Sequence, residues 1–296
     1  MEAAVRHDGA DAVFAAGAMR MALRPSAGGR IAALWSDDDG VRHDILVPML
    51  PGPFDPANWP KAGCYPLLPF SNRIRDAVFM ADGTVVRLPA HPPGPHALHG
   101  FSQRRPWSLH EAAAGPVMRH EHEADAWPWS FAAEQRLALD ADGLTVTLWV
   151  QSRAATAMPL GMGLHPYLAA APEDRVGFAA AAEWAVDADY IATTLGSVPV
   201  RHDAPLGTAP VTRYCAGWDG VATLLRAGAP PVSVTAEAPL DHLVFHVPPG
   251  GAYLCVEPVS HVADAFNLAA RGVAGTGHRM LAPGEEATAS MRIGTG

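Results

Sequence analysis

Residues 140–151 read DADGLTVTLWVQ, and this stretch decides the fold class. From Leu144 onward, Leu and Val occupy every second position and Thr, Trp or Gln the positions between them, which is typical of a strand with two different faces. Residues 140–143 are turn formers, and Phe131–Leu139 before them is suited to be the partner strand. The stretch therefore predicts an antiparallel hairpin.

Short runs of the same kind recur along the chain, and Gly, Pro or Asp clusters such as residues 37–40 and 248–251 bound them. The further runs are Ile31–Trp35, Thr84–Leu88, Val221–Leu225, Val232–Ala236, Leu243–Val247, Tyr253–Val256 and Ala287–Ile293. With 28 Gly and 28 Pro in 296 residues, long helices have little room, and one short helix is expected at Val262–Ala270. We predict an all-β antiparallel sandwich or barrel. No linker or repeat divides the chain, so residues 1–296 are expected to form one domain.

Composition excludes several classes of protein. Hydrophobic residues make up 49% and charged residues 17% of the chain, as in a globular protein. The net charge of −9 has the wrong sign for a nucleic-acid binder. Three widely separated cysteines form neither a disulfide framework nor a metal motif, and they fit a reducing compartment. Because residues 1–24 lack a signal-peptide pattern and no apolar run suits a membrane helix, we expect a cytoplasmic protein.

Four segments place polar and ionisable groups in apolar, Pro-punctuated surroundings. They are Gly63–Ile74, His96–Trp107, Met158–Tyr167 and Tyr253–Asn267. In the last, Glu257 follows an apolar strand end, where desolvation raises the pKa of a carboxyl toward a value useful for a general base. His165 lies between Gly163 and Pro166 in what reads as a rigid turn. Taken singly, each of these two residues also fits a purely structural role.

Three further candidates in these segments are equally ambiguous when taken alone. Arg73 is a forked donor suited to sugar hydroxyls or a carboxylate, and equally to a surface ion pair. His96 and His99 lie three residues apart in a loop rich in Pro and Gly, where each suits a ligand-binding or a surface position.

Together the four segments resemble the aldose 1-epimerase (mutarotase) family. Residues 69–74, PFSNRI, are similar to the family's P-F-x-N-R-I segment, and residues 98–100 to its L-H-G segment. Residues 165–167 are similar to its H-P-Y segment and residues 256–258 to its V-E-P segment. Each tripeptide is weak evidence, whereas four in the same order and at suitable distances are specific.

The resemblance implies a large antiparallel β supersandwich, galactose mutarotase-like, with few short helices and an open sugar cleft. It also implies interconversion of the α and β anomers of a monosaccharide by ring opening and closure, without metal or organic cofactor. By motif position Glu257 is the general base and His165 the general acid, two groups whose pKa values an enzyme must set apart. Asn72 and Arg73 hold sugar oxygens, and His99 binds beside the ring oxygen. The oligomeric state does not follow.

One position departs from the family pattern. Many members carry a sugar-binding Asp in a segment resembling L-D-x-C-F-x-G-W, and residues 211–218 of this chain read VTRYCAGW, with Thr212 at the Asp position. Asp203 and Asp219 are the candidates to replace it. The sugar is therefore not specified by the resemblance.

Three alternatives stay open. Arg75, Arg104 and Arg105 lie near the motifs and suit the phosphate grip of a hexose-6-phosphate 1-epimerase. A carbohydrate-binding protein without catalytic activity is a second alternative on the same scaffold. A metal enzyme is the third, suggested by residues 119–123, RHEHE, although a solvated, charged edge strand explains that segment better.

Several nearby residues are expected to be structural. Trp107, Trp127, Trp129 and Trp184 suit core positions, the commoner use of Trp. Cys255 shares a strand face with Glu257 under strict alternation, so it is expected beneath the proposed base.

Overall fold

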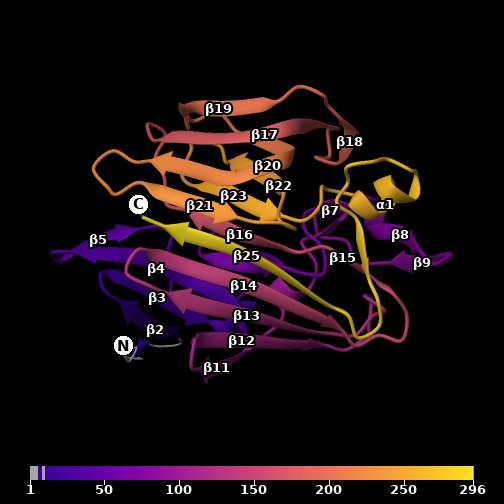
Figure 1. Ribbon diagram of the computed structural model, residues 1–296, viewed down its shortest axis with the longest axis horizontal. Helices are drawn as coiled ribbons and strands as arrows, with labels where there is room; N and C mark the ends of the chain where they lie inside the picture. Colours follow the sequence, from indigo (N-terminus) through magenta and orange to yellow (C-terminus); the bar gives the residue numbers. More distant parts are fainter. Residues whose placement is uncertain (1–5, 9–10, 296) are drawn as a thin grey trace.

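The computed structural model describes residues 6–8 and 11–295, and β-strands dominate this part of the chain (Figure 1). Nineteen of the strands join in one antiparallel network. The hairpin predicted from the sequence is present, since β13 (Phe131–Leu139) pairs in register with β14 (Gly143–Ser152). The predicted all-β antiparallel class is confirmed.

The network folds into two layers. One layer runs from β11 through β12, β13, β14 and β25 to β21. Besides β13 and β14, it contains β11 (Ser108–Ala112), β12 (Gly115–His122), β21 (Val232–Ala236) and β25 (Glu286–Gly294). The other runs from β1 through β2, β3, β4, β6, β16, β23 and β22 to β20. Its strands are β1 (Arg6–Asp8), β2 (Asp11–Ala16), β3 (Met19–Arg24), β4 (Arg30–Asp38), β6 (Cys64–Leu67), β16 (Gly163–Leu168), β20 (Val211–Leu225), β22 (His242–Val247) and β23 (Leu254–Val259).

Strand β20 joins the layers, because residues 211–216 pair with β22 and residues 221–224 pair with β21. The layers enclose one large apolar cluster, in which Met21 of β3 and Leu34 of β4 are buried with Val146 and Leu148 of β14. Hydrophobic burial between two sheets is what makes a β-sandwich stable.

The remaining elements are short. The strands outside the two layers' main runs are β5 (Val41–Asp44), β7 (Arg73–Ile74), β8 (Val78–Ala81), β9 (Thr84–Arg87), β10 (Ala97–Leu98), β15 (Met158–Leu160), β17 (Arg175–Val186), β18 (Ala192–Leu195), β19 (Val200–Pro205) and β24 (Arg279–Leu281). The 3₁₀ turns are Pro25–Ala27, Arg75–Ala77 and Ser102–Arg104. The expected helix exists as α1, shortened to Ala265–Ala270. Within the described residues no helix has the length and apolarity to cross a bilayer.

The interpretation of residues 119–123 as a solvated edge strand was wrong. Strand β12 pairs with β11 on one side and β13 on the other, so it is internal to its layer. His120 and His122 are buried, and their rings stack on Trp107 and Phe131, with centroids 5.3 Å and 4.8 Å apart. The faces of the two imidazole rings thus pack against buried aromatic side chains of the core. The four tryptophans assigned to the core are all buried.

Strand alternation separates the main core from a second buried cluster on the outer face of β6, β16, β23 and β22. Leu164 of β16 and Val256 of β23 enter the main core, whereas Tyr167 and Cys255 face the second cluster. Because the side-chain period of a strand is two, His165 and Glu257 also face outward. The sandwich thus offers these two groups on one rigid sheet face.

Gly63, immediately before β6, tests how tightly this sheet is assembled. Its φ is +68°, and a Cβ there would lie 2.2 Å from the Ile31 carbonyl oxygen in β4. We expect Gly63→Ala to lower the free energy of unfolding by about 3 kcal/mol or more, because left-handed strain and a backbone clash add together. Gly83→Ala is the matched control, since Gly83 has φ +74° and open space around its Cβ position. It is expected to cost about 1–2 kcal/mol. Equal losses in urea unfolding would contradict this.

Candidate functional site

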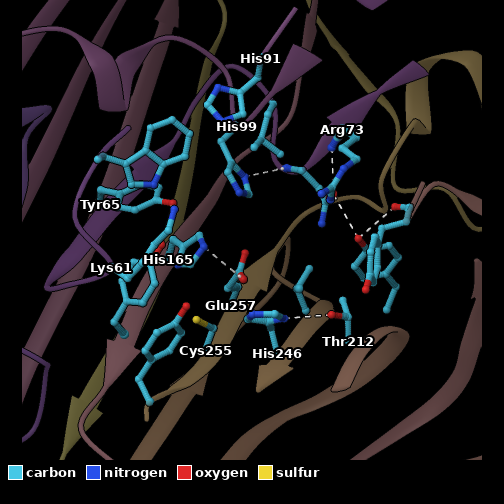
Figure 2. Close-up of a pocket in the computed structure, with 18 residues that line it drawn as sticks. Lys61, Tyr65, Arg73, His91, His99, His165, Thr212, His246, Cys255 and Glu257 are labelled. Carbon is cyan, nitrogen blue, oxygen red and sulfur yellow. Dashed lines mark hydrogen bonds and ion pairs between the residues drawn. The ribbon is translucent and has the colours of Figure 1, made fainter. Parts of the chain in front are cut away.

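A pocket of about 290 Å³ lies over the outer face of the sheet (Figure 2). Its floor consists of two rows of side chains, the first across five strands and the second across four of them. In the first row Tyr65 lies opposite His165, Glu257 opposite Val244, and Val244 opposite Tyr214. In the second row Tyr167 lies opposite Cys255, Cys255 opposite His246, and His246 opposite Thr212. The floor is thus fixed by antiparallel register.

His165 and Glu257 are the centre of the first row. The β16–β23 register, continued between its printed pairs Gly163–Val259 and Tyr167–Cys255, places these two residues opposite each other. His165 Nε2 lies 3.3 Å from Glu257 Oε1. Within the described part of the chain, His165 Nδ1 and Glu257 Oε2 have no hydrogen-bond partner. The pair is therefore in direct contact, and each group keeps one free polar atom.

The sequence interpretation of the local backbone needs correction here. His165 does not lie in a rigid turn, because β16 continues from Gly163 to Leu168. Glu257 likewise lies inside β23 rather than at its end. Pro166 and Pro258 are tolerated there because the β16–β23 ladder is interrupted between the Gly163 and Tyr167 positions.

Burial controls the proton affinity of the pair. The Glu257 side chain is 4% exposed, and desolvation raises its pKa to about 8, although Arg73 acts in the opposite direction. Desolvation, together with His99 and His246, lowers the pKa of His165 well below its usual value. The His165 ring is also stacked between Tyr65 and Tyr167, with centroids 4.6 Å and 4.5 Å away. At neutral pH the pair therefore holds one proton, mainly on Glu257.

The other three sequence candidates come from a small ladder beside the floor. Strand β7 pairs with β10, so Arg73 lies opposite Leu98. Next to this pair, the Asn72 N–H donates to His99 Nδ1 (3.1 Å), and the His99 N–H donates to the Asn72 carbonyl (2.8 Å). The structure therefore brings Asn72, Arg73, His99, His165 and Glu257 into one pocket.

These contacts fix what the wall presents to the cavity. Because His99 Nδ1 accepts a hydrogen bond and burial lowers the pKa of this imidazole, its proton lies on Nε2, a donor. Asn72 Oδ1 accepts from the Arg73 N–H (2.9 Å), the Arg73 guanidinium (3.3 Å) and the Tyr214 hydroxyl (3.2 Å). The amide oxygen of Asn72 is thus occupied, and it orients Arg73.

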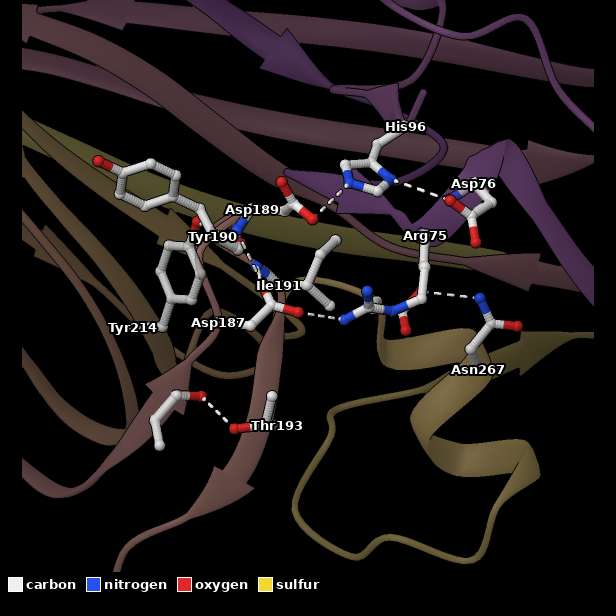
Figure 3. A network of polar contacts seen from close by, with 12 residues as sticks. Arg75, Asp76, His96, Asp187, Asp189, Tyr190, Ile191, Thr193, Tyr214 and Asn267 are labelled. Atoms are coloured by element: carbon white, nitrogen blue, oxygen red, sulfur yellow. Dashed lines mark hydrogen bonds and ion pairs between the residues drawn. The ribbon is translucent and has the colours of Figure 1, made fainter. Parts of the chain in front are cut away.

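A loop from the β17–β18 connection brings Tyr190 to the wall (Figure 3). Arg75, just after β7, pairs with Asp187, and His96, just before β10, lies 3.7 Å from Asp189, so the loop is held against the segments that flank the β7–β10 pair. The guanidinium of Arg73 lies 5.4 Å from the Tyr190 ring centroid. This loop therefore confines Arg73 between an amide and an aromatic face.

The candidates for replacing the family's Asp and for gripping a phosphate do not line the pocket. Asp203 pairs with Arg175, and Asp219 accepts from the Val221 N–H. Neither carboxylate therefore replaces the Asp that the family pattern has at the Thr212 position. Thr212 itself lines the pocket, and its Oγ1 lies 2.9 Å from His246 Nδ1.

Of the three arginines considered for a phosphate, Arg75 is held by Asp187 and Arg105 by Asp125. Arg104 donates to the Leu98 carbonyl (3.0 Å) and lies outside the lining.

Known proteins that resemble this chain point to one family. The family model for aldose 1-epimerase matches residues 13–294. The chain belongs to the aldose 1-epimerase family. Uncharacterized protein YphB of Escherichia coli K12 is 30% identical to this chain over 249 residues, which cover 78% of this chain and 83% of YphB.

Solved structures agree on the aldose 1-epimerase fold. A galactose mutarotase-like protein from Clostridium acetobutylicum superposes with a TM-score of 0.84 at 19% identity, covering 98% of each chain. Galactose 1-epimerase from Lactobacillus acidophilus NCFM gives a TM-score of 0.76 at 12% identity, covering 99% of this chain and 97% of that one. The supersandwich inferred from the family resemblance is therefore confirmed.

Sequence reasoning missed much of the lining. Tyr65 and Tyr167 occur inside the motif segments, yet nothing in the sequence indicates that their rings enclose His165. Lys61, His91 and His246 carry no local signal, because they reach the pocket through strand register and loop course. The other lining residues are Trp59, Leu98, Tyr190, Tyr214, Val244 and Tyr253. Cys255 lies on the face of Glu257, as strand alternation predicts.

One set of metal-ligating groups lies within the pocket. The ligand atoms of His165, Cys255 and Glu257 all lie within 4.8 Å of one another, and in the described residues no other group of three or more qualifies. Imidazole, thiolate and carboxylate are a ligand set that suits zinc. Burial raises the pKa of both Cys255 and Glu257, so a metal ion here would have to displace their protons.

The buried carboxyl makes stability depend on pH. The folded-state pKa of Glu257, about 8, lies above its usual value of 4.5, so its contribution is fully present below pH 4.5 and is lost as the pH rises through 8. At pH 9 we expect Glu257→Gln to have a free energy of unfolding a few kcal/mol above that of the wild type, because one pKa unit corresponds to about 1.4 kcal/mol. The variant should therefore unfold at a higher temperature. At pH 5 the difference should be small. Differential scanning calorimetry at both pH values checks this, and a difference independent of pH would contradict it.

Proposed function

We propose that this protein is an aldose 1-epimerase that interconverts the α and β anomers of a monosaccharide by acid/base ring opening and closure. The observation that carries the proposal is the 3.3 Å contact between His165 Nε2 and Glu257 Oε1 on the pocket floor. The anomeric hydroxyl and the ring oxygen are bonded to the same carbon, so two adjacent groups can reach both. The pocket volume is near the lower end of the roughly 300–1,000 Å³ common for ligand pockets, which suits a single sugar ring.

The reaction needs one proton on the pair. Ring opening starts with Glu257 as carboxylate and His165 as imidazolium, the ionisation reached when the proton of the resting pair crosses from Oε1 to Nε2. Glu257 takes the proton of the anomeric hydroxyl, His165 gives its proton to the ring oxygen, and the bond between C1 and the ring oxygen breaks. The open aldehyde is left beside a neutral His165 and a protonated Glu257. Rotation about C1–C2 and the reverse proton transfers close the other anomer.

The wall residues have proposed binding roles. His99 donates from Nε2 to an oxygen near the reacting centre, and Arg73 donates to sugar hydroxyls from its fixed position against Tyr190. Asn72 orients Arg73 and offers its amide N–H groups to the sugar. No metal or organic cofactor enters this scheme. A cytoplasmic location belongs to the same proposal, and the three cysteines, which are free thiols and buried, fit it.

Loss of either member of the pair tests this proposal. We expect Glu257→Gln and His165→Asn each to lower kcat/KM for anomer exchange by about 10²–10⁴-fold, the usual contribution of general acid–base catalysis. The measurement is polarimetry or NMR exchange with a panel of aldoses and their 6-phosphates. Glu111→Gln, on the exposed β11, is the matched control. Unaltered rates in both pair variants would contradict the assignment, and no acceleration of any sugar would favour a binding protein without catalysis. Activity should be indifferent to EDTA.

The pH dependence of the rate tests the proton count. Because the pair must hold one proton and the pKa of Glu257 is about 8, kcat/KM should fall about tenfold per pH unit above pH 8. The acidic limb should lie well below pH 6.5, since the second proton would have to enter His165, whose pKa is strongly lowered. Background exchange catalysed by hydroxide is subtracted at each pH. A rate that rises through pH 8 would contradict the scheme.

A further inference from the structure

The pocket is electrically unlike the rest of the molecule. The chain has a net charge of −9, yet Glu257 is the one carboxylate among the described lining residues. Two basic side chains, Lys61 and Arg73, line the same cavity, and burial lowers the pKa of Lys61. The cationic side chains of the lining therefore outnumber its single carboxylate.

Lys61 is the only lysine in the 296 residues. It lies on the side of the pocket where Tyr65 and His165 lie (Figure 2). Its ammonium is 4.9 Å from the Trp59 ring centroid, and in the described residues no carboxylate forms an ion pair with it. Lys61 lines the cavity, and after desolvation its positive charge is one of the influences on the pKa of Cys255, His99 and His165.

Two further cations lie behind the lining. The Arg30 guanidinium is fully buried 4.4 Å from the Tyr65 ring centroid, and its donors reach the carbonyls of Ala27 and Ala62. The Arg104 guanidinium lies 5.3 Å from the centroid of the Trp59 ring, which Lys61 also contacts. Neither has a carboxylate partner in the part of the chain that the structure describes. Buried cations without counter-charges are costly, and a bound anion would offset that cost.

Building on the proposed function, we propose that the preferred substrate is an acidic monosaccharide whose carboxylate binds the Lys61 ammonium. In a hexuronate the carboxylate is attached to C5, the carbon bonded to the ring oxygen. A ring whose ring oxygen faces His165 therefore directs this group to the side of the pocket on which Lys61 lies. A single point charge suits a carboxylate. Of the three arginines considered for a phosphate, Arg75 is held by Asp187 and Arg105 by Asp125, and Arg104 donates to the Leu98 carbonyl outside the lining.

Kinetics of anomer exchange provides the first test. We expect kcat/KM for glucuronate or galacturonate to exceed that for glucose or galactose about tenfold, because a hydrogen bond between charged groups strengthens binding of the acidic sugar. Lys61→Met should abolish this ratio, Lys61→Arg should retain part of it, and added salt should reduce it. Arg201→Gln, an exposed position outside the lining, is the matched control for lost positive charge and should leave the ratio unchanged.

A binding measurement separates this inference from the proposed function. Reductive ¹³C-methylation keeps the charge and marks the single lysine side chain, whose signal is identified by its absence in Lys61→Met. We expect this signal to shift on titration with glucuronate and to stay unchanged with glucose.

The possible outcomes are distinguishable. Exchange of neutral sugars at equal or higher rates, with no shift by uronates, would overturn the inference and leave the epimerase proposal intact. A uronate-induced shift without acceleration of any sugar would support the acidic ligand and overturn the epimerase. A preference for glucose 6-phosphate over uronates would overturn the carboxylate assignment.

Discussion

The burial of the Glu257 carboxyl against the His165 imidazole is the constraint around which the pocket is arranged. Two antiparallel strands hold the groups opposite each other at 3.3 Å, and the rings of Tyr65 and Tyr167 enclose the imidazole. Removing water raises the pKa of the carboxyl and lowers that of the imidazole, so both neutral forms are favoured. A stable sandwich is needed to impose this, because an exposed pair would ionise independently in water. The same desolvation that makes the pair useful therefore costs stability above pH 8.

The remaining residues of the site act on this pair through charge and hydrogen bonds. Asn72 connects His99 and Arg73, because its backbone N–H donates to His99 and its side-chain oxygen accepts from Arg73. Arg73 in turn opposes the rise in the pKa of Glu257, which keeps the carboxyl close to the range in which it can accept a proton. Desolvation, His99 and His246 lower the pKa of the imidazole, and the unpaired charges of Arg30 and Lys61 on the opposite side add to this effect, so the imidazole is neutral when the pocket is empty. A negatively charged substrate would offset those charges and favour the imidazolium that ring opening requires.

The sequence predicted the architecture and the five candidate residues for different physical reasons. Alternation at residues 144–151 depends only on local periodicity, and it predicted a strand whose hairpin partner, Phe131–Leu139, is confirmed. The motif segments around Asn72, His99, His165 and Glu257 are short and contiguous, so a family resemblance was sufficient to find them. The rows that form the floor are different, because Tyr65, His165, Glu257 and Tyr214 come from four strands far apart in the sequence, and register between such strands has no local signal. The same limit explains His120 and His122, which are buried because β11 pairs along β12.

The central claim is that His165 and Glu257 share one proton at neutral pH, and site-specific NMR tests it most directly. The ¹³C shift of the Glu257 carboxyl and the ¹⁵N shifts of the His165 ring are followed from pH 5 to pH 10 in the folded, unliganded protein, with Glu257→Gln and His165→Asn used for assignment. The account predicts that Glu257 titrates at about pH 8, while His165 stays neutral throughout. A Glu257 carboxyl already ionised at pH 6, beside either a neutral or a charged His165, would contradict it.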